Sequence, residues 1–74
     1  MKLIPGISTH FIVISEGIYG LDGITIGKVY EIIKWDDTIF HFWDDSRSWR
    51  SWIDVYIVVE DASFEENLKN ILSE

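Results

Sequence analysis

The sequence predicts a mostly β domain, in which five short strands close into a small barrel and one α-helix follows at the C-terminal end. Two observations carry this prediction. Five apolar or alternating runs, separated by glycine or aspartate turns, follow one another within about fifty residues, and this spacing favours a barrel over an open sheet. From residue 63 the apolar residues change from the period of a strand to that of a helix.

Length and composition limit the chain to one domain, residues 1–74, with no room for a second core. The hydrophobic fraction is 47% and the aromatic fraction 15%, so we expect a core dense in rings. The lack of cysteine excludes disulfides, zinc–thiolate sites and thiol nucleophiles. Residues 1–6 lack the apolar region of a signal peptide, and no run reaches the roughly 20 residues that span a bilayer. These features predict a cytoplasmic protein without membrane contact.

The formal net charge is −7, from 13 acidic and 6 basic residues. A field of this sign repels the phosphate backbone, so direct binding to nucleic acid is disfavoured. An acidic surface suits a basic protein partner. It could also imitate nucleic acid and so bind a protein whose normal ligand is nucleic acid. The alternative is that the charge only keeps a small apolar domain soluble.

The first three strands are expected over residues 9–15, 28–35 and 38–43. The first contains Phe11-Ile12-Val13-Ile14, a β-branched run typical of a buried strand. A long loop follows it, because Gly17, Gly20 and Gly23 supply positions that tolerate a positive φ. Asp36-Asp37 predicts the turn of a hairpin between the second and third strands.

The last two strands are expected over residues 49–52 and 56–59, so that the barrel covers about residues 8–60. Residues 44–48 form the turn before the fourth strand, and residues 53–55 interrupt the chain before the fifth. Their short lengths and polar turns agree with a small closed sheet.

A helix is expected over residues 63–73. Its apolar residues lie at i, i+4, i+7 and i+8, and they are Phe64, Leu68, Ile71 and Leu72. Ser63 and Glu66 have the spacing of a capping box, and Glu65 with Lys69 forms an i, i+4 pair of opposite charge.

Both faces of the second and third strands are apolar, which is unexpected in a small barrel with one face in water. One face carries Tyr30, Ile32, Phe40 and Phe42; the other carries Val29, Glu31, Ile33, Trp35, Ile39, His41 and Trp43. We expect the C-terminal helix to cover the second face. The alternative is a homodimer or another partner at that face, because a large exposed apolar patch marks an interaction site.

The order of these elements resembles the Src-homology-3 fold over about residues 11–60. The resemblance rests on two features. The first is an apolar step, a glycine and a long strand in Ile24-Thr25-Ile26-Gly27-Lys28-Val29-Tyr30-Glu31-Ile32-Ile33, and the second is the hairpin turn that follows. The same stretch is similar to small bacteriophage and mobile-element proteins. Peptide-binding members of that family have a tryptophan at the position of Thr38-Ile39 and a proline near the position of Ile53. Neither residue is present here, so the resemblance does not imply polyproline binding.

The aspartate pairs and the histidines are the candidates for metal or acid-base chemistry. Asp36-Asp37 and Asp44-Asp45 lie at opposite ends of one predicted strand, roughly 23 Å apart, and each pair is explained by turn formation. His10 and His41 are the groups that titrate near neutrality, but no nucleophile elbow or His-Glu-x-x-His pair accompanies them. We therefore expect no metal, no cofactor and no enzymatic activity.

The candidate partner-binding site is the segment that holds three of the four tryptophans and both arginines: Trp43, Asp44, Asp45, Arg47, Trp49, Arg50 and Trp52. Tryptophan and arginine are enriched at interface hot spots. The spacing of Trp49 and Trp52 in a strand puts their rings on opposite faces. The alternative is that Arg47 pairs with Asp44 or Asp45 while Arg50 stacks on a ring.

The leading hypothesis from these features is a non-enzymatic protein-binding module of a phage or mobile element. It would bind or inhibit a host protein in the host cytoplasm, for counter-defence or host takeover, with nucleic-acid mimicry as its sharper form. The alternative is binding of single-stranded nucleic acid on stacked aromatic rings, with Arg47, Arg50, Lys28 and Lys34 as the basic lining.

Overall fold

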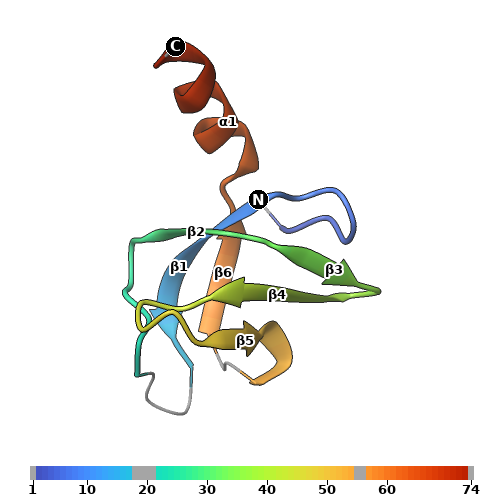
Figure 1. The fold of residues 1–74 in the computed structure, drawn as a ribbon, viewed down its shortest axis with the longest axis vertical. Helices are drawn as coiled ribbons and strands as arrows, with labels where there is room; N and C mark the ends of the chain where they lie inside the picture. Colours follow the sequence, from blue (N-terminus) through green and yellow to red (C-terminus); the bar gives the residue numbers. More distant parts are fainter. Residues whose placement is uncertain (1, 18–21, 55–56, 74) are drawn as a thin grey trace.

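Six strands and one α-helix are present in the described residues, 2–17, 22–54 and 57–73, of this computed structural model. Their order is β1 (His10–Glu16), β2 (Val29–Glu31), β3 (Lys34–Asp36), β4 (Ile39–Trp43), β5 (Trp49–Ser51), the 3-10 helix η1 (Trp52–Asp54), β6 (Ile57–Asp61) and α1 (Ser63–Leu72) (Figure 1). The mostly β composition and the C-terminal helix are confirmed, whereas the predicted number of five strands is wrong. Gly20, Val55 and Tyr56, on which the first loop and the start of the last strand were predicted, lie outside the described residues.

The strands form two antiparallel sheets of three, with the orders β2-β1-β6 and β3-β4-β5. Their inward side chains and that of Ile32, between β2 and β3, meet in one hydrophobic cluster; the strand residues in it are Phe11, Val13, Tyr30, Phe40, Phe42 and Ile57. Phe11 lies at its centre, because its ring centroid is 4.8 Å from those of both Phe40 and Phe42. The aromatic core predicted from composition is therefore confirmed.

The single strand expected over residues 28–35 is in fact β2 and β3, which belong to different sheets. The Ile32 amide donates a hydrogen bond to the Thr9 carbonyl (2.8 Å), while the next amide, of Ile33, donates to the His41 carbonyl (2.9 Å). The chain therefore passes from one sheet to the other at these two residues. The break also corrects the predicted side of Trp35, which faces Phe40 across the β3–β4 pair at a ring distance of 5.3 Å.

The predicted alternation is confirmed elsewhere on the two strands. Tyr30, Phe40 and Phe42 are buried, and the neighbouring side chains on the opposite face are not. The residues at the crossing, Ile32 and Ile33, are β-branched and typical of strands, and neither glycine nor proline marks the break. The sequence pattern therefore did not reveal it.

The helix α1 projects away from both sheets (Figure 1), and none of its described residues is buried. The prediction that it covers the outer face of the sheet is wrong. Only Ala62 separates β6 from α1, and the Ala62 amide still donates to the His10 carbonyl of β1 (3.1 Å), so the helix starts directly beyond the end of the sheet. No described helix is long and apolar enough to cross a bilayer.

The capping box predicted for Ser63 is also absent. The helix is preceded by Ala62 without a side-chain cap, and the Ser63 hydroxyl instead accepts hydrogen bonds from the amides of Thr9 (2.7 Å) and His10 (3.2 Å). Ser63 therefore holds the first turn of the helix to β1 instead of closing its N-terminus.

Candidate functional site

Asp44 organises the turn between β4 and β5 from a buried position. Its Oδ1 atom accepts hydrogen bonds from the amides of Ser46 (2.9 Å) and Ser48 (2.8 Å), and its Oδ2 atom accepts one from Arg50 Nε (2.8 Å). Burial acts to raise the pKa of this carboxyl, but the bonds from Ser48, Arg50 and Ser46 outweigh it and lower the pKa. Asp44 is thus held as a charged anchor inside the turn.

Asp45 ties the same turn to the segment that precedes β2. Its carboxylate accepts hydrogen bonds from the hydroxyls of Thr25 (2.8 Å) and Tyr30 (3.0 Å), and it pairs with the Lys28 ammonium. The hydrogen bond from Lys28 is the main cause that lowers the pKa of Asp45. The Asp45 amide in addition donates to the Gly23 carbonyl (2.7 Å).

Three of the seven predicted site residues, Asp44, Asp45 and Arg50, therefore make internal contacts that fix the turn. The Arg50 guanidinium also donates to the Asp22 carbonyl (3.2 Å), so it bridges two segments, and no ring of residues 2–17, 22–54 and 57–73 stacks on it. Ion pairing of Arg47 with either aspartate, the alternative drawn from the sequence, is replaced by the pairs Arg50–Asp44 and Lys28–Asp45. Both carboxylates are thus paired with cations of the same chain, and that of Asp44 is buried.

Trp43 and Trp49 form the exposed part of the cluster. They are direct partners in the β4–β5 register, their ring centroids lie 4.8 Å apart at 69°, and they are 49% and 45% exposed. The His41 ring stacks on Trp49 at 5.4 Å and 10°. We call His41, Trp43 and Trp49 the outer aromatic face.

Arg47 lies at the edge of this face, where it lines a shallow hollow together with Trp43. Its backbone is in the left-handed region with φ 61°, a conformation that costs a non-glycine residue roughly 1–2 kcal/mol. Glycine is the usual residue at such a turn position. The turn therefore presents an exposed guanidinium beside two exposed tryptophans at a cost that glycine would avoid.

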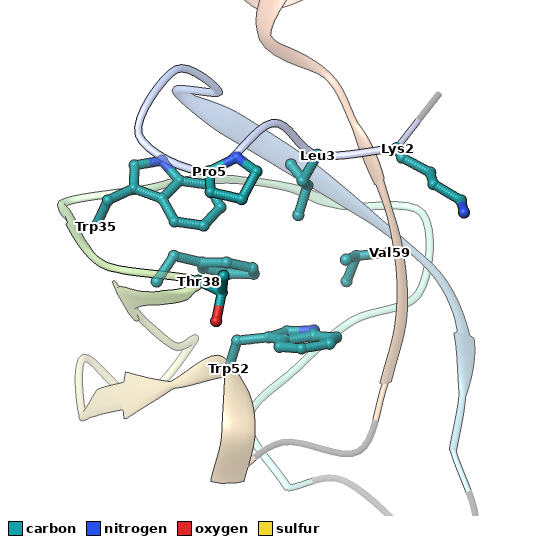
Figure 2. A pocket seen from close by; sticks show the side chains of 8 residues that line it. Lys2, Leu3, Pro5, Trp35, Thr38, Trp52 and Val59 are labelled. Carbon is teal, nitrogen blue, oxygen red and sulfur yellow. The ribbon is translucent and has the colours of Figure 1, made fainter.

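Trp52, the last predicted site residue, lies in a different place. It opens η1, and its ring stacks on Phe40 with centroids 5.9 Å apart. With Trp35, Thr38 and Phe40 it lines a hollow of about 350 Å³, and the lining is completed by Lys2, Leu3, Pro5 and Val59 (Figure 2). The Trp35 indole N–H is already satisfied by the Ser8 carbonyl (2.7 Å). The structure thus separates Trp52 from the outer aromatic face.

His41 and Ser51 are the described residues that come nearest to a catalytic arrangement, because the Ser51 hydroxyl lies 2.8 Å from His41 Nδ1. A nucleophilic serine also needs an acid that orients the imidazole and donors that stabilise an oxyanion. The hydrogen bonds found within residues 2–17, 22–54 and 57–73 supply neither at this pair. The same residues contain no group of three or more histidine or acidic side chains that could hold a metal ion.

His41 and Trp35 were missed as site residues, although the sequence held signals for one of them. Alternation along β4 places His41 on the same face as Trp43, so its neighbourhood could be predicted. Trp35 joins the hollow at Trp52 only because of the break between β2 and β3, which has no sequence signature.

The fold and the site define a small β-rich protein with two three-stranded sheets, a projecting helix and an exposed tryptophan pair. No protein-family model, curated protein or solved structure matches this chain.

Proposed function

We propose that the chain is a non-enzymatic protein-binding module whose contact surface is the outer aromatic face with Arg47. The observation that carries the proposal is the strained, exposed Arg47 beside the half-exposed pair Trp43 and Trp49. Tryptophan and arginine supply most hot-spot energy in protein interfaces, and non-glycine residues in the left-handed region cluster at functional sites. Asp44, Asp45 and Arg50 support this surface by fixing the turn.

The finer parts of the proposal concern fold family and biological setting. We propose a Src-homology-3-like barrel, supported by the order of β1 to β6 with η1 before the last strand. We also propose that the chain is an accessory protein of a phage or mobile element that inhibits a host protein in the cytoplasm. A basic partner suits the charge of −7. Mimicry of nucleic acid would have to use carboxylates outside the turn, such as Glu31 and Asp36, which are exposed.

The test is affinity capture from bacterial lysate with matched baits. Arg47→Gly removes the guanidinium and relieves the left-handed strain, so stability is expected to stay within about 1 kcal/mol of wild type while recovery of a true partner falls at least about fivefold. Asp37→Gly is the control, because Asp37 has the same φ of 60° in the β3–β4 turn. Trp49→Thr should reduce recovery, and Val58→Thr, an exposed change on β6, should not.

A protein that is recovered equally by all baits does not use this face. If every captured protein behaved in this way, the proposal would be contradicted. A captured partner is then titrated with and without duplex DNA at low and high salt. Competition by DNA and weakening above about 0.2 M salt are expected for mimicry of nucleic acid. Binding that is indifferent to both would exclude mimicry while leaving the protein-binding module in place.

The second candidate function is binding of single-stranded nucleic acid, because exposed rings such as Trp43 and Trp49 can stack on bases. Its basic lining is reduced by the structure: Lys28 and Arg50 are paired with carboxylates, which leaves Arg47 and Lys34 of the four predicted cations. A titration of labelled oligothymidine at low salt that quenches tryptophan fluorescence in wild type, but not in Trp49→Thr, would favour this function. An unchanged signal in wild type would reject it.

A further inference from the structure

The apolar stripe of α1 has no cover within the described residues. Phe64 is 69% exposed, Leu68 42%, Ile71 68% and Leu72 76%. A helix of ten residues is shorter than the roughly 12–15 residues at which isolated helices become marginally stable in water. Helices of this length are normally stabilised by burial of their apolar stripe, so α1 is expected to gain a packing partner.

The position of α1 is nevertheless well defined. The Ser63 hydroxyl accepts from the amides of Thr9 and His10, at the start of β1. The Ser63 amide donates to Asp61 Oδ1 (2.8 Å), and Asn67 Nδ2 donates to the Thr9 hydroxyl (3.3 Å). These contacts hold the first turn at the end of the sheet, and the rest of the helix extends into solvent (Figure 1). The principal extents of 38 × 25 × 23 Å include this projection. The apolar stripe is therefore exposed to solvent and does not pack against the sheets.

We propose that α1 packs antiparallel against α1 of a second copy of the chain, forming a weak homodimer. The stripe is self-complementary about Leu68: a two-fold axis there brings Leu68 against its own counterpart and Phe64 against the Leu72 position of the second copy. Residues four apart lie one above the other on a helix face, so the large ring at one end meets a leucine at the other.

Charge selects the antiparallel direction. Glu65 and Lys69 flank Leu68 and Leu72 along one edge of the stripe, where they line a shallow hollow with them. In the antiparallel pair the edges that carry Glu65 and Lys69 adjoin, so Glu65 lies near Lys69 of the second copy. In a parallel pair this edge would face the opposite edge of the partner helix, which carries Asn67, and the attraction would be lost. These attractions also offset part of the repulsion between two chains of charge −7.

The contact is small. Four side chains on each ten-residue helix bury far less than the about 800 Å² per partner of a standard interface, so the dimer belongs with weak associations. We expect a dissociation constant on the order of 100 μM. The outer aromatic face lies on the β3-β4-β5 sheet and remains open in this dimer, so the two surfaces can be tested separately.

The test is sedimentation equilibrium of the full chain from about 5 μM to about 1 mM. The weight-average mass should rise from that of the 8.7 kDa monomer toward twice this value. Leu68→Glu places two carboxylates on the two-fold axis and should keep the mass at the monomer value. Asn70→Glu adds the same charge on the opposite side of the helix and should leave the dissociation constant unchanged.

Far-UV circular dichroism of both variants separates lost association from lost helix, and Ile71→Glu serves as a second stripe variant if Leu68→Glu unfolds α1. Two variants test the charge pair. Glu65→Lys should raise the dissociation constant at least about threefold, and the double variant Glu65→Lys with Lys69→Glu should restore it. Monomer mass at about 1 mM, or loss of dimer in Trp49→Thr with none in Leu68→Glu, would overturn the proposal.

Discussion

Replacing Asp44 with asparagine tests whether the buried carboxylate holds the β4–β5 turn. Asparagine has nearly the same shape, and its single oxygen can keep the bonds from the amides of Ser46 and Ser48. Its amino group, however, would face the Arg50 Nε–H, so a donor meets a donor where a charge-assisted bond of 2.8 Å existed. The perturbation is therefore confined to one contact.

The expected loss follows from that contact. A charge-assisted hydrogen bond contributes about 1.5–3 kcal/mol, and the lower half of this range applies because the Arg50 side chain is 33% exposed. The buried amino group that faces a donor adds about 1 kcal/mol. The sum of about 2.5–3 kcal/mol is a large part of the roughly 4–11 kcal/mol expected for a chain of this size, and lowers the melting temperature by roughly 10–24 °C.

Thermal and urea unfolding followed by tryptophan fluorescence measure this loss. Asp37→Asn, the same chemical change at an exposed turn residue with φ 60°, should alter the free energy of unfolding by less than about 0.5 kcal/mol. Because the folded state depresses the pKa of Asp44, its contribution is present above the unfolded pKa of about 3.9 and is lost as pH falls through the folded pKa. The gap between wild type and Asp44→Asn should therefore narrow below about pH 4. Equal stability of the two at pH 7 would refute the reasoning.

Three further changes address the core and the contacts of the turn. Phe11→Ala removes the ring at the centre of the aromatic cluster and should cost about 3–5 kcal/mol; near-native urea stability would contradict the packing described. Gly23→Ala places a Cβ 3.1 Å from Asp44 Oδ2 at a φ of 79°, so a loss of about 2 kcal/mol is expected by urea titration, and a gain would be inconsistent with this conformation. Tyr30→Phe removes the hydroxyl that donates to Asp45 and accepts from the Thr25 amide, and should lower the melting temperature by roughly 4–8 °C, whereas an unchanged value would show that these two bonds contribute nothing.

The elements with strong local patterns were predicted well. The β-branched run at β1, the aspartate turn before β4 and the 3.6-residue period of α1 each depend on neighbours in sequence, so their signals are visible in the chain. The division of residues 28–35 into β2 and β3 was not predicted, because it depends on hydrogen bonds from Ile32 to Thr9, next to β1, and from Ile33 to His41 in β4 of the other sheet.

The candidate site shows the same division. Composition and spacing pointed to the segment with Trp43, Arg47 and Trp49, and the alternation of strand residues placed His41 beside them. The internal roles of Asp44 and Asp45 could not be predicted, because their partners Arg50 and Lys28 compete with Arg47 for the same carboxylates and only the three-dimensional distances decide between them.

The sequence by itself determined that this is a small, acidic, mostly β protein with an aromatic core and an amphipathic C-terminal helix, because charge, composition and periodicity are local properties. Only the tertiary structure decided where the helix lies and which polar groups are already paired. A period of 3.6 residues shows that α1 has an apolar stripe, but the direction in which the chain leaves β6 determines that this stripe faces solvent and not the sheet.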